Sequence, residues 1–138
     1  VYLDSGDVQA AIRRFEAALA RYPNKMQLVY DYPEALMAAG RNADAAAFCE
    51  QQLLRFTRDG PLHLTAARAY AALNKRLAQH RAQAEAYVRL GNLPAAVEQL
   101  RIGLKSGDGD FYQASSAEAR LRELRRLDEE MRRDAAKR

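Results

Sequence analysis

The sequence repeats itself with a period of 34 residues. Four positions near its start return one period later: Gly6, Ala11, Phe15 and Leu19 are followed by Gly40, Ala45, Cys49 and Leu53. Small residues at constant offsets, with helical patterning between them, are typical of helical hairpins stacked side by side. Each hairpin in such a stack contacts only its neighbours, so the array grows in one dimension and exposes a long surface. The period therefore predicts an all-α solenoid.

Helix-breaking residues predict where the individual helices end. Pro23 should end the first complete helix, because proline cannot continue the backbone hydrogen-bond ladder. Gly40 should end the second helix, and Asn74, one period later, is the next best residue for the same left-handed cap. Residues 59–61, which read Asp-Gly-Pro, should separate the second hairpin from the third. We also expect residues 1–4 to form the last turn of a preceding helix.

Two places in the N-terminal part are harder to assign. Gly6 and Asp7 predict a turn and an N-cap just before the first complete helix. Pro33 falls inside the second predicted helix, where proline removes one hydrogen bond and bends the axis. Either that helix begins near Pro33 or it is kinked there.

The period breaks after the third unit, because Gly91 follows Asn74 by 17 residues, half of the repeat. We interpret the helix between them, roughly residues 76–90, as shared: it closes the third hairpin and opens the fourth. The expected fold is a right-handed α-solenoid of antiparallel helix pairs over residues 1–106, with its first repeat truncated, as part of a longer protein. A turn and a long C-terminal capping helix should follow over residues 107–138, since the last hairpin would otherwise expose an apolar face.

The start of the capping helix carries its own signals. The stretch from Gly107 to Asp110 contains two glycines and should be the most flexible part of the chain. Ser115 and Glu118 have the spacing of a capping box, in which each side chain bonds the backbone of the other residue. We therefore expect the helix to begin at or before Ser115.

Composition argues against several classes of function. The net charge is +4, from 22 Lys and Arg against 18 Asp and Glu, and the basic residues are interleaved with acids rather than gathered into a nucleic-acid-binding stripe. The two histidines, His63 and His80, lie 17 residues apart and form no zinc-binding helix pattern. Cys49 occupies the helix position that Phe15 has in the first repeat, so we interpret it as a small buried hydrophobe. We expect no catalytic residue, no metal ligand and no cofactor in this chain.

In a solenoid of helix pairs, the first helix of each pair lines the concave side. Side chains of those helices that do not pack on a neighbour should point into a groove that takes partner proteins or peptides. Arginine suits bidentate bonds to carboxylates, and tyrosine suits an anchor in such a groove. The candidates are Gln27, Tyr30, Glu34 and Met37 in the second unit, Leu64 and Arg68 in the third, and Arg81, Glu85 and Arg89 in the shared helix.

The repeat resembles the tetratricopeptide repeat family across nearly the whole chain. The matching positions are the turns at Gly6 and Gly91, the alanines at 11, 45 and 96, the pair Ala18 and Leu19, and Pro23. The aromatic and Gly-Tyr positions of the family's first helices are poorly kept. Family members that clamp the C-terminal carboxylate of chaperones use Lys and Asn where Tyr30 and Glu34 stand here, so that activity is not expected. The resemblance implies a protein-binding module that is not an enzyme.

A narrower resemblance covers about residues 62–126. The chain is similar there to the C-terminal tail of bacterial periplasmic zinc metalloproteases of the β-barrel assembly-enhancing (BepA-like) type. The runs that carry it are AARAYAALNK at residues 66–75, AEAYVRLGNL at 84–93, AAVEQL at 95–100, GDFY at 109–112 and ARLREL at 119–124.

In that family an HExxH protease domain precedes a tail that engages the outer-membrane β-barrel assembly machinery and immature outer-membrane proteins. The resemblance thus implies a periplasmic location, a tethering role for this tail, and zinc only in a catalytic domain that is absent from this chain.

Three other interpretations remain open. A free-standing scaffold or assembly factor of the same fold would have no protease attached to it. Catalysis by this chain itself and binding of nucleic acid are less favoured by the residues. Exposed alanine-rich faces near the N-terminus also leave room for pairing with a second copy.

Overall fold

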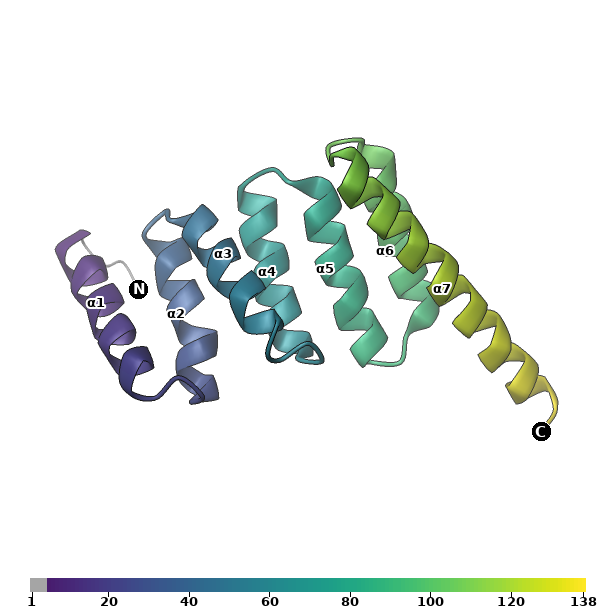
Figure 1. The fold of residues 1–138 in the computed structure, drawn as a ribbon, viewed down its shortest axis with the longest axis horizontal. Helices are drawn as coiled ribbons and strands as arrows, with labels where there is room; N and C mark the ends of the chain where they lie inside the picture. The colour runs from purple at the N-terminus through teal and green to yellow at the C-terminus, as the bar shows by residue number, and fades with distance from the viewer. Residues whose placement is uncertain (1–4) are drawn as a thin grey trace.

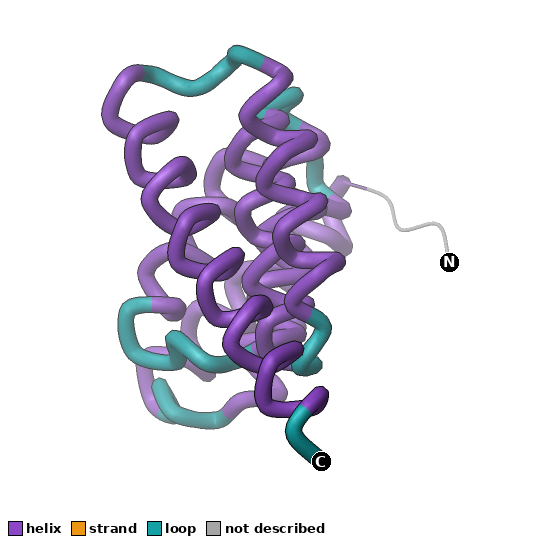
Figure 2. The backbone as a smooth tube through the Cα atoms, turned by 90° about the vertical axis from the view of Figure 1, so that its right-hand side faces the viewer, coloured by secondary structure: helices purple, strands orange, loops and turns teal. Residues whose placement is uncertain are grey.

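The computed structural model describes residues 5–138, apart from the side chain of Ser5. These residues form seven helices and no strand, as the repeat predicts (Figure 1). The helices are α1 (Ser5–Arg21), α2 (Met26–Ala38), α3 (Asn42–Leu53), α4 (Gly60–Ala72), α5 (Arg76–Arg89), α6 (Leu93–Ser106) and α7 (Phe111–Ala136). Short loops join consecutive helices at the upper and lower ends of the helices. Figure 2 shows these loops from the side that α7 occupies. The expected helical turn at residues 1–4 lies outside the described residues.

The left-handed caps predicted at Gly40 and Asn74 are confirmed, and Gly91 and Gly107 adopt the same conformation. Gly40, Gly91 and Gly107 all have a positive φ, between 69° and 77°, and Asn74 has a φ of 59°. Only glycine, and less often asparagine, adopts this conformation without a large steric cost, which is why these residues end helices. Asn74 is the one residue other than glycine with a positive φ among the described residues.

In the N-terminal part, one predicted turn is wrong, and the structure decides whether the second helix begins at Pro33 or runs through it. The turn expected at Gly6 is wrong, because Gly6 and Asp7 both lie within α1. A glycine in a helix costs only about 1 kcal/mol relative to alanine. The negative charge of Asp7 in the same turn interacts favourably with the positive end of the helix dipole. In α2, the helix runs from Met26 through Pro33, so Pro33 is an interior residue rather than the helix start. The Pro33 ring is fully buried, although proline has no backbone N–H to donate to the preceding turn.

The helices pack as a row with two helices laid on one side of it. Direct contacts join α2 to α4, α4 to α5, and α5 to α6, and we call these four the floor helices. Helix α3 contacts both α2 and α4, whereas α7 contacts both α5 and α6. Figure 1 views the molecule from the side on which α3 and α7 lie, in front of the floor. The front of α4 and α5 thus has a helix on either side of it.

Helix α5 behaves as a shared helix. It packs against α4 on one side and against α6 on the other, as expected of a helix that closes one pair and opens the next. Its Leu77 and Ala84 belong to the core beneath α6 and α7, together with Leu100, Leu121 and others. Its Ala82 belongs instead to the core around α4, with residues such as Leu62. A third core cluster joins α1, α2, α3 and α4.

The turn before α7 is tied to the body of the protein, contrary to the expectation of a flexible stretch. The Asp108 carboxylate accepts hydrogen bonds from the backbone N–H groups of Arg76, at 2.5 Å, and Leu77, at 2.9 Å. It therefore caps α5 from 31 residues away in sequence, and these bonds lower its pKa. The capping box of α7 is formed by Asp110 and Gln113, not by Ser115 and Glu118, because α7 begins one turn earlier than that pair.

No helix in the described part of the chain combines the length and the apolar character that crossing a bilayer requires.

Candidate binding groove

A hollow of about 680 Å³ opens on the front of α4 and α5, between α3 and α7. We call it the α3–α7 groove. The groove exists because α5 is a shared helix. It packs directly against α4 in the floor, and no described helix covers the place in front of these two helices. Its volume lies within the range of about 300–1,000 Å³ that is usual for ligand sites.

The floor of the groove is made of small side chains. Ala66 of α4 and Ala78 and Ala82 of α5 line it. Ala66 and Ala82 are buried, and Ala78 is partly buried. Alanine has no side chain beyond Cβ, so these positions let α4 and α5 approach closely and leave the space above them open.

The wall on the α3 side joins α3 to α4. Glu50 and Leu53 of α3 line it together with His63 and Tyr70 of α4. The Tyr70 hydroxyl donates a hydrogen bond to the Glu50 carboxylate. Burial and the neighbouring carboxylate both raise the pKa of Tyr70, so this phenol stays protonated as a donor.

The wall on the α7 side is held by a bidentate ion pair. Arg120 of α7 donates to Glu85 of α5 through Nε, at 2.8 Å, and through Nη2, at 3.0 Å. Arg120 also lies 3.0 Å from Glu123 on its own helix, and these carboxylates raise its pKa. Two aligned N–H donors on one carboxylate fix both distance and orientation, so this pair sets the position of α7 over α5.

Arg81 stands between these walls with a different kind of partner. Its Nη2 donates to the hydroxyl of Ser116 in α7, at 3.0 Å. None of the ion pairs formed by the described residues includes Arg81, although its side chain is only partly exposed. A guanidinium has five N–H donors, and only one hydrogen bond joins Arg81 to another described side chain.

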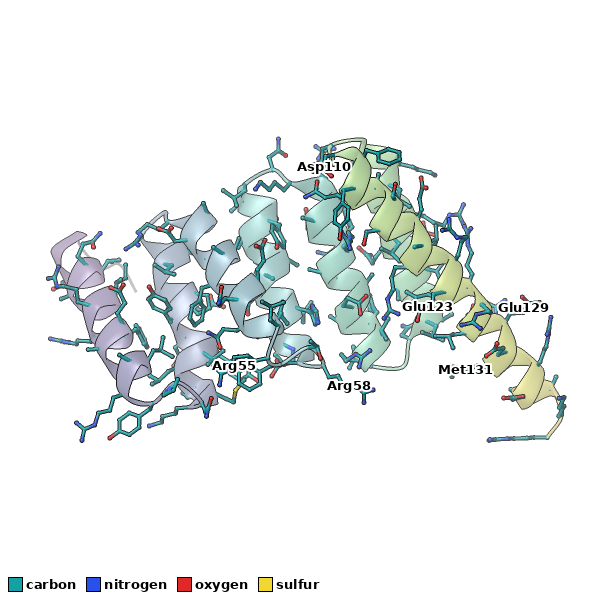
Figure 3. The ribbon with its side chains drawn as sticks, viewed as in Figure 1. Arg55, Arg58, Asp110, Glu123, Glu129 and Met131 are labelled. Atoms are coloured by element: carbon teal, nitrogen blue, oxygen red, sulfur yellow. The ribbon has the colours of Figure 1, made fainter. Side chains whose placement is uncertain are left out.

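Aromatic side chains stand at the upper rim. Tyr112, in the first turn of α7, lines the groove and is 79% exposed, and its neighbour Phe111 is 88% exposed. Asp110, which caps this helix, is labelled at its upper end in Figure 3. Large exposed aromatics beside a hollow are typical of surfaces that bind other molecules.

The predicted site residues fall into different surroundings. Arg81 and Glu85 line the groove, as described above. Glu34 and Arg68, one period apart, form an ion pair between α2 and α4, which includes a hydrogen bond of 3.1 Å from Nη1 to Oε2. Arg68 is two residues from both Ala66 and Tyr70, so its side chain lies roughly on the opposite side of α4 from the groove.

The remaining predicted residues make local contacts or face solvent. The Tyr30 hydroxyl donates to Asp59 at 2.5 Å, which joins α2 to the start of α4. Gln27 bonds to Asp31 one turn along α2, at 2.9 Å. Met37 packs on the N-terminal core, whereas Leu64 and Arg89 are exposed. Their roles in binding stay predictions.

Several groove residues were missed by sequence reasoning. Glu50, Tyr112, Ser116 and Arg120 were not among the candidates, because α3 and α7 were not expected to line a groove. Tyr70 was missed although it lies on α4. A signal for the α7 side does exist in the offsets. The pairs Arg81 with Ser116 and Glu85 with Arg120 are both 35 residues apart, close to the repeat period.

No three His, Cys, Asp or Glu side chains among residues 5–138 converge as a metal ion requires. The Cys49 thiol is fully buried, and burial together with the nearby Glu34 raises its pKa to about 12. It is a core side chain, as the repeat alignment with Phe15 predicts.

Comparison with known proteins supports the repeat assignment. Residues 2–65 match the family model described as Tetratricopeptide repeat. No curated protein matches the chain. Tetratricopeptide repeats generally mediate protein–protein interaction, and the helices that follow residue 65 continue the same packing of neighbour on neighbour. The chain is an all-α solenoid whose residues 2–65 are similar to tetratricopeptide repeats.

Proposed function

We propose that this chain binds polypeptide segments in the α3–α7 groove, as the protein-binding tail of a periplasmic zinc metalloprotease. In this role it holds the protease at the outer-membrane β-barrel assembly machinery and presents unfolded outer-membrane proteins to it. Zinc belongs to the catalytic domain of the parent protein and not to this chain.

One observation carries the binding role: the groove itself. It combines an alanine floor, two walls that offer hydrogen-bonding groups, and exposed aromatic side chains at its rim. A mostly closed apolar pocket would favour a small molecule, but this hollow is open and polar along its walls. Such a surface suits a polypeptide, whose backbone and side chains offer donors and acceptors throughout.

The narrower role is supported by the resemblance over residues 62–126. That stretch contributes α4 and α5, which form the floor, and most of α7, which forms one wall. A tail that binds substrate weakly still raises the local concentration of that substrate near a tethered active site, to the millimolar range for short linkers. Tethering therefore needs no catalytic residue in the solenoid.

Site-specific photocrosslinking in the cells that make the parent protein tests this proposal. A benzophenone amino acid replaces Tyr112 at the groove rim, and the matched control replaces Ala71, an exposed residue of α4 outside the groove. We expect position 112 to capture outer-membrane β-barrel proteins or components of their assembly machinery. Position 71 should capture neither.

Equal capture at both positions would show that the groove is not the binding surface. Capture of neither class of protein at position 112 would contradict the periplasmic role. The parent sequence gives a second test: an HExxH helix upstream of residue 1 is expected, whereas a lipoprotein signal without one would favour the free-standing scaffold.

A further inference from the structure

The place in front of α4 and α5 differs from the rest of the front of the floor helices. Three positions along the front of the floor are defined by the contacts between helices. Helix α3 lies over the junction of α2 with α4, and α7 lies over the junction of α5 with α6. The junction of α4 with α5, between them, is covered by no described helix, and the groove lies there.

We propose that this place is filled by one α-helix of a partner protein, which lies between α3 and α7 and completes the front layer. The inference rests on the proposed function, because it assumes that a polypeptide enters the groove. It goes further by specifying the conformation and the surface chemistry of that polypeptide.

The neighbouring helices show what such a helix needs on its inner face. Helix α3 sits on the floor through Ala45, Ala46 and Cys49, all of which are buried and small. The groove floor is itself lined by alanines, so two small surfaces would meet there. Small residues on both helices permit close axes, at the short end of the usual range of about 8–10 Å.

The walls specify polar groups on the flanks of the incoming helix. On the α7 side, Arg81 has only a neutral hydroxyl partner, so an acidic side chain of the partner would complete its hydrogen bonds. Lys75 also lines the groove, and so does the carboxylate of Asp110, so Arg81 is the cation whose only side-chain partner there is a neutral hydroxyl. On the α3 side, Glu50 accepts only from Tyr70 and suits a basic or amide group.

The partner is therefore an amphipathic helix of unusual composition. Its inner face carries Ala, Gly or Ser at spacings of three and four residues, and one flank carries Asp or Glu. A helix with Leu or Phe on that face would be held away from the alanine floor, because side chains of that size do not fit between closely packed helices.

Binding selections with two peptide libraries test the inference on the 138-residue chain. One library contains stapled helices of about 14 residues, or four turns, with alanine fixed at three positions that copy the spacing of Ala45, Ala46 and Cys49. The other contains linear peptides of the same length with a central proline, which disfavours a helix. We expect groove binders from the helical library, enriched in Asp and Glu on one flank.

Four variants of the chain then locate the bound helix. Ala78→Leu fills the floor, and Arg81→Gln removes the unpaired charge, whereas Ala71→Leu and Arg89→Gln are matched exposed controls outside the groove. Selected helices should lose at least about tenfold in affinity for Ala78→Leu and about fivefold for Arg81→Gln. Both control variants should bind within about twofold of the unaltered chain. Arg81→Gln serves as the readout if Ala78→Leu does not fold by circular dichroism.

The outcomes separate this inference from the proposed function. Helical binders that are indifferent to both groove variants overturn the inference. Binders that come only from the proline library and weaken with Arg81→Gln leave the groove as a polypeptide site but show that it takes an extended segment. No groove binder from either library counts against both proposals.

Discussion

At the scale of single residues, Asp108 lies one repeat period after Asn74 and stabilises the start of α5. Asn74 ends α4 with a left-handed cap, and Asp108, one period later, caps the start of α5 instead. The residue at the N-cap position of α5, Lys75, makes no side-chain cap bond of its own. The orphan N–H groups of α5 are thus satisfied by a carboxylate that arrives with the turn before α7.

Replacing Asp108 by alanine should lower the free energy of unfolding at pH 7 by about 1 kcal/mol, the usual effect of losing a capping carboxylate. The hydrogen bonds from Leu77 and Arg76 hold the pKa of Asp108 below its unfolded value, so its contribution is present above about pH 4 and is lost as the pH falls through the folded pKa. Urea titrations at pH 7 and pH 3 measure both effects. The matched control is Glu98→Ala on the exposed face of α6. A difference from the unaltered chain that is as large at pH 3 as at pH 7 would exclude the capping role of the charge.

Cys49 provides a second prediction at this scale. Because the thiol is fully buried and its pKa is raised to about 12, almost no thiolate is present or accessible at pH 8. We expect no reaction with a disulfide reagent in the folded chain within an hour, and complete reaction in urea. Rapid labelling of the folded chain would show that the core around Cys49 opens readily.

At the scale of helices, the pairs of side chains about one repeat apart connect elements that are neighbours but not consecutive. Glu34 and Arg68 join α2 to α4, and Glu85 and Arg120 join α5 to α7. The second pair is the more enclosed, since both of its side chains are 26% exposed, against 58% and 44% for Arg68 and Glu34. Solvent screens the first pair more strongly.

Double-mutant cycles should rank the two pairs in that order. We expect a coupling free energy of about 1 kcal/mol for Glu85 and Arg120, from the bidentate geometry, and at most about half of that for Glu34 and Arg68. The cycles use alanine at each position and the free energy of unfolding from urea titration. Raising the salt concentration should reduce the coupling of the exposed pair first. Equal couplings would mean that enclosure does not govern these contacts.

Several helix ends could be predicted from sequence, whereas the groove could not. Gly40, Asn74 and Gly91 are visible as caps because a positive φ restricts the residue type at each position. Which face of α4 lines the groove depends instead on where α3 and α7 lie, and that is decided by packing between helices far apart in the chain. Sequence reasoning placed Arg68 in a concave groove; its side chain lies on the other side of α4 from Tyr70, and its role in binding stays a prediction.

At the scale of the whole molecule, the number of neighbours differs along the stack. Among the described helices, α1 contacts α2 alone, whereas α5 contacts α4, α6 and α7. The C-terminal turns of α7 extend past α6 with Glu129 and Met131 exposed, as Figures 1 and 3 show. In a one-dimensional array, local stability follows the contacts that each unit makes with its neighbours.

Hydrogen exchange should therefore vary in a graded way along the chain. We expect the amides of α1 and of the last two turns of α7 to exchange fastest and those of α5 to exchange slowest, close to the rate set by global unfolding. Mass spectrometry of peptides after timed exchange measures this order. Uniform protection from α1 to α7 would indicate that the stack unfolds as a single cooperative unit.

The hydrogen bonds by which Asp108 caps α5 also determine how the protein would carry mechanical load. A pull on α7 reaches α5 directly, through Asp108 and through the Glu85–Arg120 pair, without first passing along the whole of α6. A pull on α1 passes through its contact with α2 alone. The two ends of the chain therefore differ in strength under tension: α1 should peel away first, while the α5–α7 end, with the groove wall that it forms, stays intact.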